Sequence, residues 1–161
     1  LFVVTGKNFL SERGNSKALL NSLNEFNNCI WLQGVPHDEM VKWYQVSDIA
    51  LIPSLWPEGM SMASIEAMAS GLPVIATNHG AFKDYIFHQY NGWLCSPENI
   101  FHEGLAALQK LNSDTNLLRN LSENALSYAR NRLSRERSLS NFKAFFDKRL
   151  IDIDSDLSIP N

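Results

Sequence analysis

The chain has 161 residues, which is enough for one domain with a buried core. Apolar residues make up 45% and charged residues 19%, as in an ordinary globular protein, and no apolar run approaches the roughly 18 residues of a membrane span. The net charge of −3 argues against nucleic acid as a partner. The two cysteines, Cys29 and Cys95, are too few for a disulfide framework or a metal cluster and indicate a reducing, cytoplasmic setting.

The chain opens on a strand pattern, because Leu1 to Thr5 is a continuous apolar and β-branched run. A sequence that begins inside such a pattern, with Leu rather than Met, is expected to be part of a longer protein. Further strands are predicted over residues 30–33, 49–52, 73–77 and 93–95. Helices are predicted over residues 16–26, 117–133 and 134–150, from Pro36, from Pro97 and shortly after Gly80.

Strands and helices alternate about every 25 residues, which predicts an α/β domain with a parallel sheet covered by helices on both faces. The last residues, 151–161, alternate acids with isoleucine and follow neither a helical nor a strand period. We expect them to form a frayed tail.

The segment from Pro53 to Gly71 joins two predicted strands through a loop and a helix, and it carries Glu58, Gly59 and Glu66. In parallel sheets, ligands bind at the carboxyl ends of the strands, where this loop must lie. Positions eight apart differ by roughly 80° around a helix, so both glutamates can face one crevice with the helix N-terminus between them. The free N–H groups of a helix N-terminus suit a phosphate, and glycine lets the backbone approach a ligand closely.

Two carboxylates beside an anion site would repel the anion unless their partners are hydroxyl groups. A phosphorylated, polyhydroxylated ligand such as a sugar nucleotide satisfies both demands. Simpler interpretations stay open: Glu58 can be an acid that stabilises the helix dipole, and Glu66 can be a solvated helix residue. The helix around Glu66 is apolar nearly all round, however, and a charge in such a helix usually has a partner.

The segment PSLWPEGMSMASIEAMASGLPVIAT resembles the E-x7-E region of the retaining GT-B glycosyltransferases of family 4, the group 1 glycosyltransferases, with Glu58 and Glu66 as its two glutamates. The preceding stretch IWLQGVPHDEMVKWYQVSDIALIPS resembles the strand, helix and strand that come before this region in the family. Gly80 through Asp84 and Asn91-Gly92 also match in order. The resemblance covers residues 1–150.

The resemblance implies that residues 1–150 are the nucleotide-sugar donor-binding domain, a Rossmann-like half of a GT-B fold that lacks its first βα unit. Glu58, the candidate catalytic residue, would contact the hydroxyls of the donor sugar, and Glu66 would bind the ribose hydroxyls. The following residues would complete the donor site: the backbone of Gly59, Met60 and Ser61 at the sugar and diphosphate, and Val35, with Gly34, along the base.

The chain departs from the family pattern in two ways. Met60-Ser61 replaces the usual Phe-Gly after Glu-Gly, which leaves the identity of the donor open. The family's diphosphate-binding Arg and Lys, and its acceptor domain, would lie upstream of Leu1. Lys7 and Arg13 can assist the phosphates or be ordinary surface charges.

By resemblance, the enzyme transfers a sugar from a nucleotide-diphosphate sugar to an acceptor in glycan or polysaccharide biosynthesis, with no metal and no cofactor. The upstream acceptor domain would be its partner, the last helix would pack back toward that domain, and the full-length enzyme could associate peripherally with a membrane. The 161-residue piece alone is expected to transfer no sugar.

Two other classes of function remain as alternatives. One is a non-catalytic module that binds a nucleotide or nucleotide sugar. The other is a Rossmann oxidoreductase, although no G-x-G-x-x-G follows any predicted strand. A zinc or serine hydrolase is disfavoured, because the sequence has no H-E-x-x-H, no C-x-x-C and no nucleophile elbow.

Overall fold

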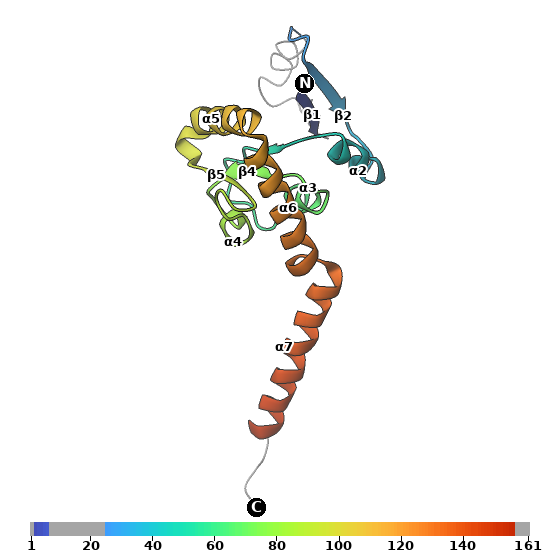
Figure 1. Cartoon of the computed structure of the whole chain (residues 1–161). Helices are drawn as coiled ribbons and strands as arrows, with labels where there is room; N and C mark the ends of the chain where they lie inside the picture. The colour runs from blue at the N-terminus through green and yellow to red at the C-terminus, as the bar shows by residue number, and fades with distance from the viewer. Residues whose placement is uncertain (1, 7–24, 157–161) are drawn as a thin grey trace, which may run out of the picture. The chain divides into compact units, whose positions relative to one another are not determined.

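The computed structural model describes residues 2–6 and 25–156, and the chain divides into two compact units, residues 1–43 and 44–161 (Figure 1). Unit 1 contains the parallel strands β1 (Phe2–Gly6) and β2 (Cys29–Gln33), paired from Phe2 opposite Cys29 to Gly6 opposite Gln33. Helix α2 (His37–Gln45) follows Pro36, whose carbonyl oxygen accepts hydrogen bonds from the N–H groups of Glu39 and Met40 at 3.0 and 3.2 Å. Both strands were expected from the sequence.

Of the helix predicted over residues 16–26, only the last two residues can be compared with the structure. Its residues 16–24 lie outside the described part of the chain, and Glu25 and Phe26 belong to no helix. The Cys29 N–H donates a hydrogen bond to the Phe26 carbonyl oxygen at 3.2 Å, which closes a turn directly before β2.

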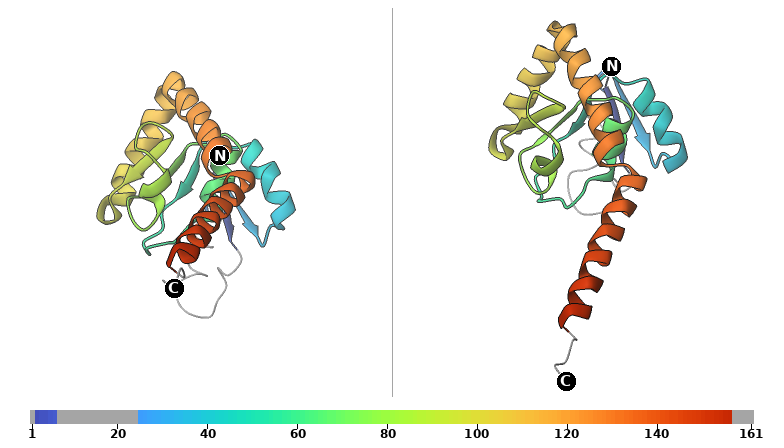
Figure 2. Two further views of the ribbon diagram at one scale, coloured as in Figure 1. Left: turned by 90° about the horizontal axis from the view of Figure 1, so that it is seen from below. Right: turned by 60° about the horizontal axis from the view of Figure 1, so that its bottom comes forward.

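Unit 2 is built on a three-stranded parallel sheet in the order β3 (Ala50–Ile52), β4 (Val74–Thr77) and β5 (Gly92–Cys95). Its helices are α3 (Met62–Ala69), α4 (Phe82–Tyr85), the 3₁₀ helix η1 (Pro97–Asn99), α5 (Ile100–Ser113), α6 (Thr115–Arg132) and α7 (Arg135–Asp156). Figure 2 shows α5 and α6 meeting at a sharp corner.

Alternate residues of β4 enter two separate hydrophobic clusters, because side chains alternate between the faces of a strand. Val74 and Ala76 pack with residues of α3, α4 and the second half of α6. Ile75 packs with Cys95, with α5 and with the first half of α6. The predicted parallel α/β arrangement with helices on both faces of a sheet is therefore confirmed.

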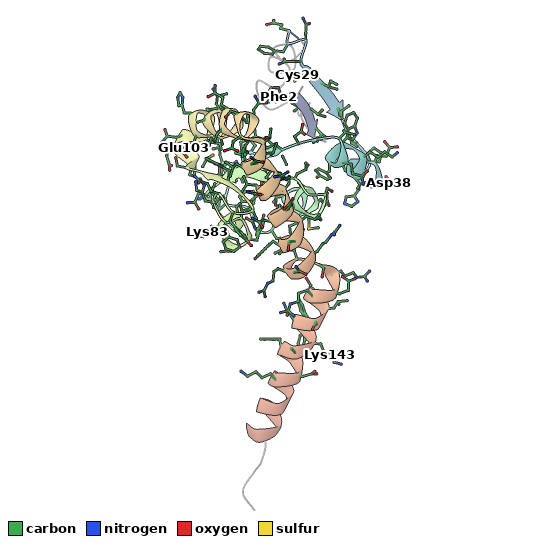
Figure 3. The ribbon with its side chains drawn as sticks, in the orientation of Figure 1. Phe2, Cys29, Asp38, Lys83, Glu103 and Lys143 are labelled. Carbon is green, nitrogen blue, oxygen red and sulfur yellow. The ribbon has the colours of Figure 1, made fainter. Side chains whose placement is uncertain are left out.

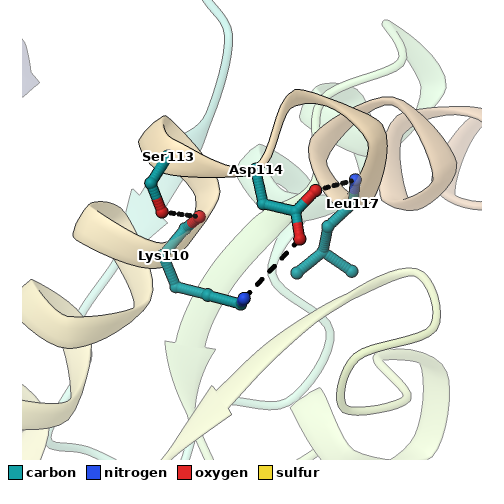
Figure 4. Close-up of polar contacts among 4 residues, drawn as sticks. All are labelled: Lys110, Ser113, Asp114 and Leu117. Atoms are coloured by element: carbon teal, nitrogen blue, oxygen red, sulfur yellow. Dashed lines mark hydrogen bonds and ion pairs between the residues drawn. The ribbon is translucent and has the colours of Figure 1, made fainter.

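The corner between α5 and α6 is fixed by Asp114, the N-cap residue of α6 (Figure 4). Its Oδ1 accepts a hydrogen bond from the Leu117 N–H at 3.0 Å, and its Oδ2 lies 3.5 Å from Lys110 Nζ. The hydrogen bond from Leu117 is the main reason that the pKa of the Asp114 carboxyl is lowered. Because this cap starts the helix, α6 begins at Thr115 and not at residue 117 as predicted.

The expectation of a frayed tail over residues 151–161 is wrong for its first part, since α7 continues to Asp156. Adding a residue to an existing helix avoids the cost of nucleation, so a weak periodicity is enough to extend it. Residues 157–161 lie outside the described part. Over residues 135–148, every side chain of α7 is exposed, including Lys143 (Figure 3) and the phenylalanines Phe142, Phe145 and Phe146.

Candidate functional site

The carboxyl ends of β3, β4 and β5 form one edge of the sheet in unit 2. Ile52 pairs with Ala76, and Ala76 pairs with Leu94, so the three strands end side by side. The segments that follow this edge are the loops of residues 53–61 and 78–81, and Ser96 with the 3₁₀ helix η1. In open α/β sheets this is the edge where ligands bind.

The loop of residues 53–61 ends at the N-terminus of α3, which has no side-chain cap. Ser61 is the N-cap residue, but its side chain makes no capping hydrogen bond. The Ser64 hydroxyl instead donates to the Ser61 carbonyl oxygen at 2.7 Å. The first N–H groups of α3, with the positive end of the helix dipole, can therefore receive a phosphate or another anion.

The loop in front of this helix end is open to solvent. Gly59 has no positive φ, and no atom lies within 4 Å of a Cβ added to it, so neither its backbone conformation nor its packing requires glycine. Met60 follows with 62% of its surface exposed, and Trp56 is 81% exposed. Such a loop leaves room for a ligand to approach the main chain.

Glu66 is the fifth residue of α3, is partly buried, and is held by Tyr44. The Tyr44 hydroxyl donates a hydrogen bond to Glu66 Oε2 at 3.3 Å. Burial, followed by the charge and the hydrogen bond of Glu66, raises the pKa of Tyr44 to about 12. A carboxylate accepts several hydrogen bonds, so ligand hydroxyls can bind Glu66 alongside Tyr44.

Glu58 lies in the middle of the loop, and its main chain is held by the turn after β4. The Glu58 carbonyl oxygen accepts a hydrogen bond from the Ala81 N–H at 3.0 Å. One residue earlier, Gly80 has a φ of +57° and packs directly against the Glu58 backbone. The side chain of Glu58 is partly buried.

The two ends of the same loop are held from β4 and α4. At its start, the buried Thr77 hydroxyl donates to the Ser54 carbonyl oxygen at 2.5 Å. At its end, the Tyr85 hydroxyl lies 2.7 Å from Ser64 Oγ on the first turn of α3. Burial is the main cause of the raised pKa of Tyr85, and the hydrogen bond with Ser64 opposes it.

The structure thus places five of the predicted site residues on one loop and helix: Glu58, Gly59, Met60, Ser61 and Glu66. Val35 is partly buried in unit 1, between β2 and α2, and Lys7 lies outside the described residues, as does Arg13. In the turn after β4, the His79 N–H donates a hydrogen bond to the Thr77 carbonyl oxygen at 2.8 Å.

Sequence reasoning missed four residues that shape this edge: Tyr44, Thr77, Gly80 and Tyr85. The partner of Tyr44 is Glu66, 22 residues further along the chain, so no local pattern links the two residues. The signal for Gly80 was visible, since a glycine directly after a buried strand often marks a turn with positive φ.

A hollow of about 310 Å³ lies in unit 2, away from the carboxyl edge of the sheet. Its lining comes from the segment after α4 and from α6: Phe87, Tyr90, Ser127, Tyr128, Asn131 and Arg132. None of these residues belongs to the loops at the carboxyl edge, so the hollow is separate from the predicted site.

Two absences concern the residues that the structure describes. No group of three or more His, Cys, Asp and Glu side chains within them could hold a metal ion. Nor do they include a helix that is both long and apolar enough to cross a membrane.

The uncapped start of α3 at the carboxyl edge of the sheet is an arrangement that can bind an anion. Residues 1–128 match the family model described as "Glycosyl transferases group 1". The match covers well over half of the chain, and the chain therefore belongs to this family.

Named relatives agree with this assignment. The chain is 36% identical over 93 residues to the "Amylovoran biosynthesis glycosyltransferase AmsK" of Erwinia amylovora, which covers 54% of this chain and 23% of that protein. It also resembles the crystal structure of the "C-terminal Domain of Glycosyl Transferase Group 1 Family Protein (LpcC)" from Francisella tularensis, with a TM-score of 0.62. The sequence identity is 26%, and the match covers 75% of this chain and 62% of that one.

The structure of Anabaena Alr3699/HepE "in complex with UDP-glucose" has the same fold, with a TM-score of 0.72 and 21% identity over 96% of this chain and 40% of that one. The chain thus spans about a quarter of the Erwinia relative and two fifths of the Anabaena chain.

Proposed function

We propose that this chain is the donor-binding domain of a retaining glycosyltransferase of family 4, and that Glu58 and Glu66 are the two glutamates of its E-x7-E motif. The observation that carries the proposal is the uncapped N-terminus of α3, which lies between the Glu58 loop and Glu66 at the carboxyl edge of the sheet. This arrangement suits a ligand that combines phosphates with sugar hydroxyls.

Each group has a role that follows from its chemistry. The first N–H groups of α3 and the backbone of Gly59, Met60 and Ser61 receive the diphosphate, whose negative charge grows when the sugar leaves. Glu66, oriented by Tyr44, accepts hydrogen bonds from the ribose hydroxyls. Glu58 binds the hydroxyls of the transferred sugar and is the candidate catalytic residue.

Two residues that precede unit 2 have roles implied by the family resemblance. Val35 would lie along the base of the nucleotide, and Lys7 would assist the phosphates. Neither role depends on a metal or cofactor, so a chelator such as EDTA should leave donor affinity unchanged.

Whole-enzyme properties are also part of the proposal. The enzyme would transfer its sugar to an acceptor in glycan or polysaccharide biosynthesis, as the name of the Erwinia relative suggests for that protein. We place it in the cytoplasm, where the free thiols of Cys29 and Cys95 would remain reduced, with peripheral association of the full-length enzyme with a membrane.

Catalysis would need an acceptor domain outside these 161 residues, because this chain spans about a quarter of the Erwinia relative. A positioned acceptor accounts for a large part of the barrier lowering in group transfer. The 161-residue chain alone should therefore show no turnover with a nucleotide sugar and an acceptor.

The direct test is calorimetric titration of the chain with the glucose conjugates of uridine, guanosine and adenosine diphosphate. We expect one of them to bind, and Glu66→Ala to weaken binding by about tenfold or more, since a hydrogen bond to a charged group contributes about 1.5–3 kcal/mol. Uridine is the first base to try, because the Anabaena structure contains UDP-glucose.

Two variants serve as controls for this titration. Glu123→Ala removes an exposed carboxylate from α6 and should leave affinity unchanged. Tyr44→Phe separates the loss of the Tyr44 contact from the loss of the carboxylate. Equal affinity of the wild type and Glu66→Ala would refute the ribose assignment, and no binding of any conjugate would refute the donor-binding function.

A further inference from the structure

We infer that Gly80 is a positioning residue for the donor site, because the turn at residues 78–81 sets the place of the Glu58 main chain. The inference rests on the proposed function in one respect, namely that Glu58 contacts the donor. The geometry that carries it does not depend on any ligand.

Gly80 and Ala81 contact the Glu58 main chain in two ways. The Ala81 N–H donates a hydrogen bond to the Glu58 carbonyl oxygen at 3.0 Å. A Cβ added to Gly80 would lie 2.8 Å from the Glu58 nitrogen and 3.1 Å from the Pro57 carbonyl carbon, and would collide with the Glu58 carbonyl oxygen. All three atoms belong to the backbone, so no flexible side chain can give way.

The collision would act on the middle of the loop, because its ends are held separately. The Thr77 hydroxyl holds Ser54 at the start, and the Tyr85 hydroxyl holds Ser64 beyond the end. A side chain at position 80 therefore has to push residues 57–59 away from the turn or break the Ala81 hydrogen bond. Either change removes a restraint on the Glu58 main chain, while the contact between Tyr85 and Ser64 on α3 remains.

The chain offers a matched control in Gly71, which follows α3. Gly71 also has a positive φ, +87°, so Gly71→Ala introduces backbone strain of the same kind as Gly80→Ala. No atom lies within 4 Å of a Cβ added to Gly71, so this variant has the strain without the collision. The difference between the two variants isolates the contact with Glu58.

The first measurement is amide hydrogen exchange of the ligand-free chain. We expect Gly80→Ala to increase exchange at Ala81 and across residues 55–61, and Gly71→Ala to leave both unchanged. Unchanged exchange in Gly80→Ala, or an equal increase in both variants, would overturn the inference. This readout decides the matter even if the wild type binds no nucleotide sugar, an outcome that would refute the proposed function alone.

The second measurement is affinity for UDP-glucose, compared with the midpoint of thermal unfolding. Both variants should unfold at lower temperature, but only Gly80→Ala should lose affinity, by about tenfold, which corresponds to about 1.4 kcal/mol. Measurements are made well below both midpoints, so that the fraction of folded protein is equal. Equal affinities of Gly80→Ala and Gly71→Ala would contradict a positioning role.

Discussion

The hydrogen bond between Tyr44 and Glu66 explains how a largely apolar helix keeps a partly buried carboxylate. Burying a carboxylate without a partner is costly, and the Tyr44 hydroxyl supplies one at 3.3 Å. Burial raises the pKa of Tyr44 most, and the Glu66 charge and hydrogen bond raise it further, because ionisation would place two negative charges side by side. The hydrogen bond therefore restrains the Glu66 carboxylate, the group that we propose binds the ribose.

The raised pKa of Tyr44 predicts how stability depends on alkaline pH. The pKa is 10.0 for an ordinary tyrosine and about 12 here, so the folded chain holds this proton more tightly than the unfolded chain. The resulting stabilisation is complete below about pH 10 and is lost as the pH rises toward 12. Denaturant unfolding between pH 9 and pH 12 should show a larger loss in the wild type than in Tyr44→Phe, because burial raises the pKa of Tyr85 and of Cys95 in both proteins. Parallel curves would contradict the contribution of Tyr44.

At the residue scale, the sequence predicted what is local and missed what is distant. Glu58, Gly59 and Glu66 lie within nine residues of one another, so their spacing and the helix period were enough to bring them to one edge. Tyr44 contacts Glu66, which lies 22 residues later in the chain. Gly80 contacts the backbone of Glu58, which lies 22 residues earlier. No local pattern encodes such a contact.

Among the elements, the junction of α5 and α6 shows how one side chain sets a helix boundary. Asp114 accepts the Leu117 N–H and also lies near Lys110 at the end of α5. A second carboxylate, Glu103 on α5 (Figure 3), accepts hydrogen bonds from both the N–H and the hydroxyl of Ser96 at 2.7 Å. These contacts hold α5 at the end of β5, beside the carboxyl edge.

Removing the Asp114 cap should destabilise the chain in a way that depends on pH. Asp114→Ala should lower the midpoint of thermal unfolding at pH 7, whereas Asp114→Asn, which keeps a capping oxygen, should lower it less. Because the pKa of Asp114 is lowered on folding, the stabilisation is present above its ordinary value of 3.8 and is lost in more acidic solution. The gap between wild type and Asp114→Ala should therefore narrow below that pH; a constant gap would contradict the assignment.

The sequence predicted strands and helices with a clear hydrophobic pattern, but not the residues at which the helices begin and end. The strands β1 to β5 were all expected, because apolar runs bounded by Gly, Pro or polar residues are typical of parallel strands. The start of α6 and the end of α7 depend on capping and on helix extension, which sequence periodicity does not report. The helix expected from Pro97 begins as the 3₁₀ turn η1 and becomes α-helical at Ile100 for the same reason.

For the whole molecule, family membership and fold agree with a candidate anion site at the carboxyl edge of the sheet. The chain belongs to the group 1 glycosyltransferases, and the edge between β3 and β4 carries an open helix end between two glutamates. The hollow beside α6 is the main competitor as a ligand site, because two tyrosines, a phenylalanine and an arginine line it. The two places share no residue, so an experiment that maps binding can separate them.

That experiment is an NMR titration of the isotope-labelled chain with UDP-glucose, following the backbone amide signals. We expect the largest shifts at residues 58–62, at the first turn of α3, and in the turn of residues 78–81. Glucose alone should leave these signals unchanged, because it lacks the diphosphate that the helix end receives. Shifts confined to Phe87, Tyr128 and Arg132 around the hollow, with none at the start of α3, would contradict the proposed donor site.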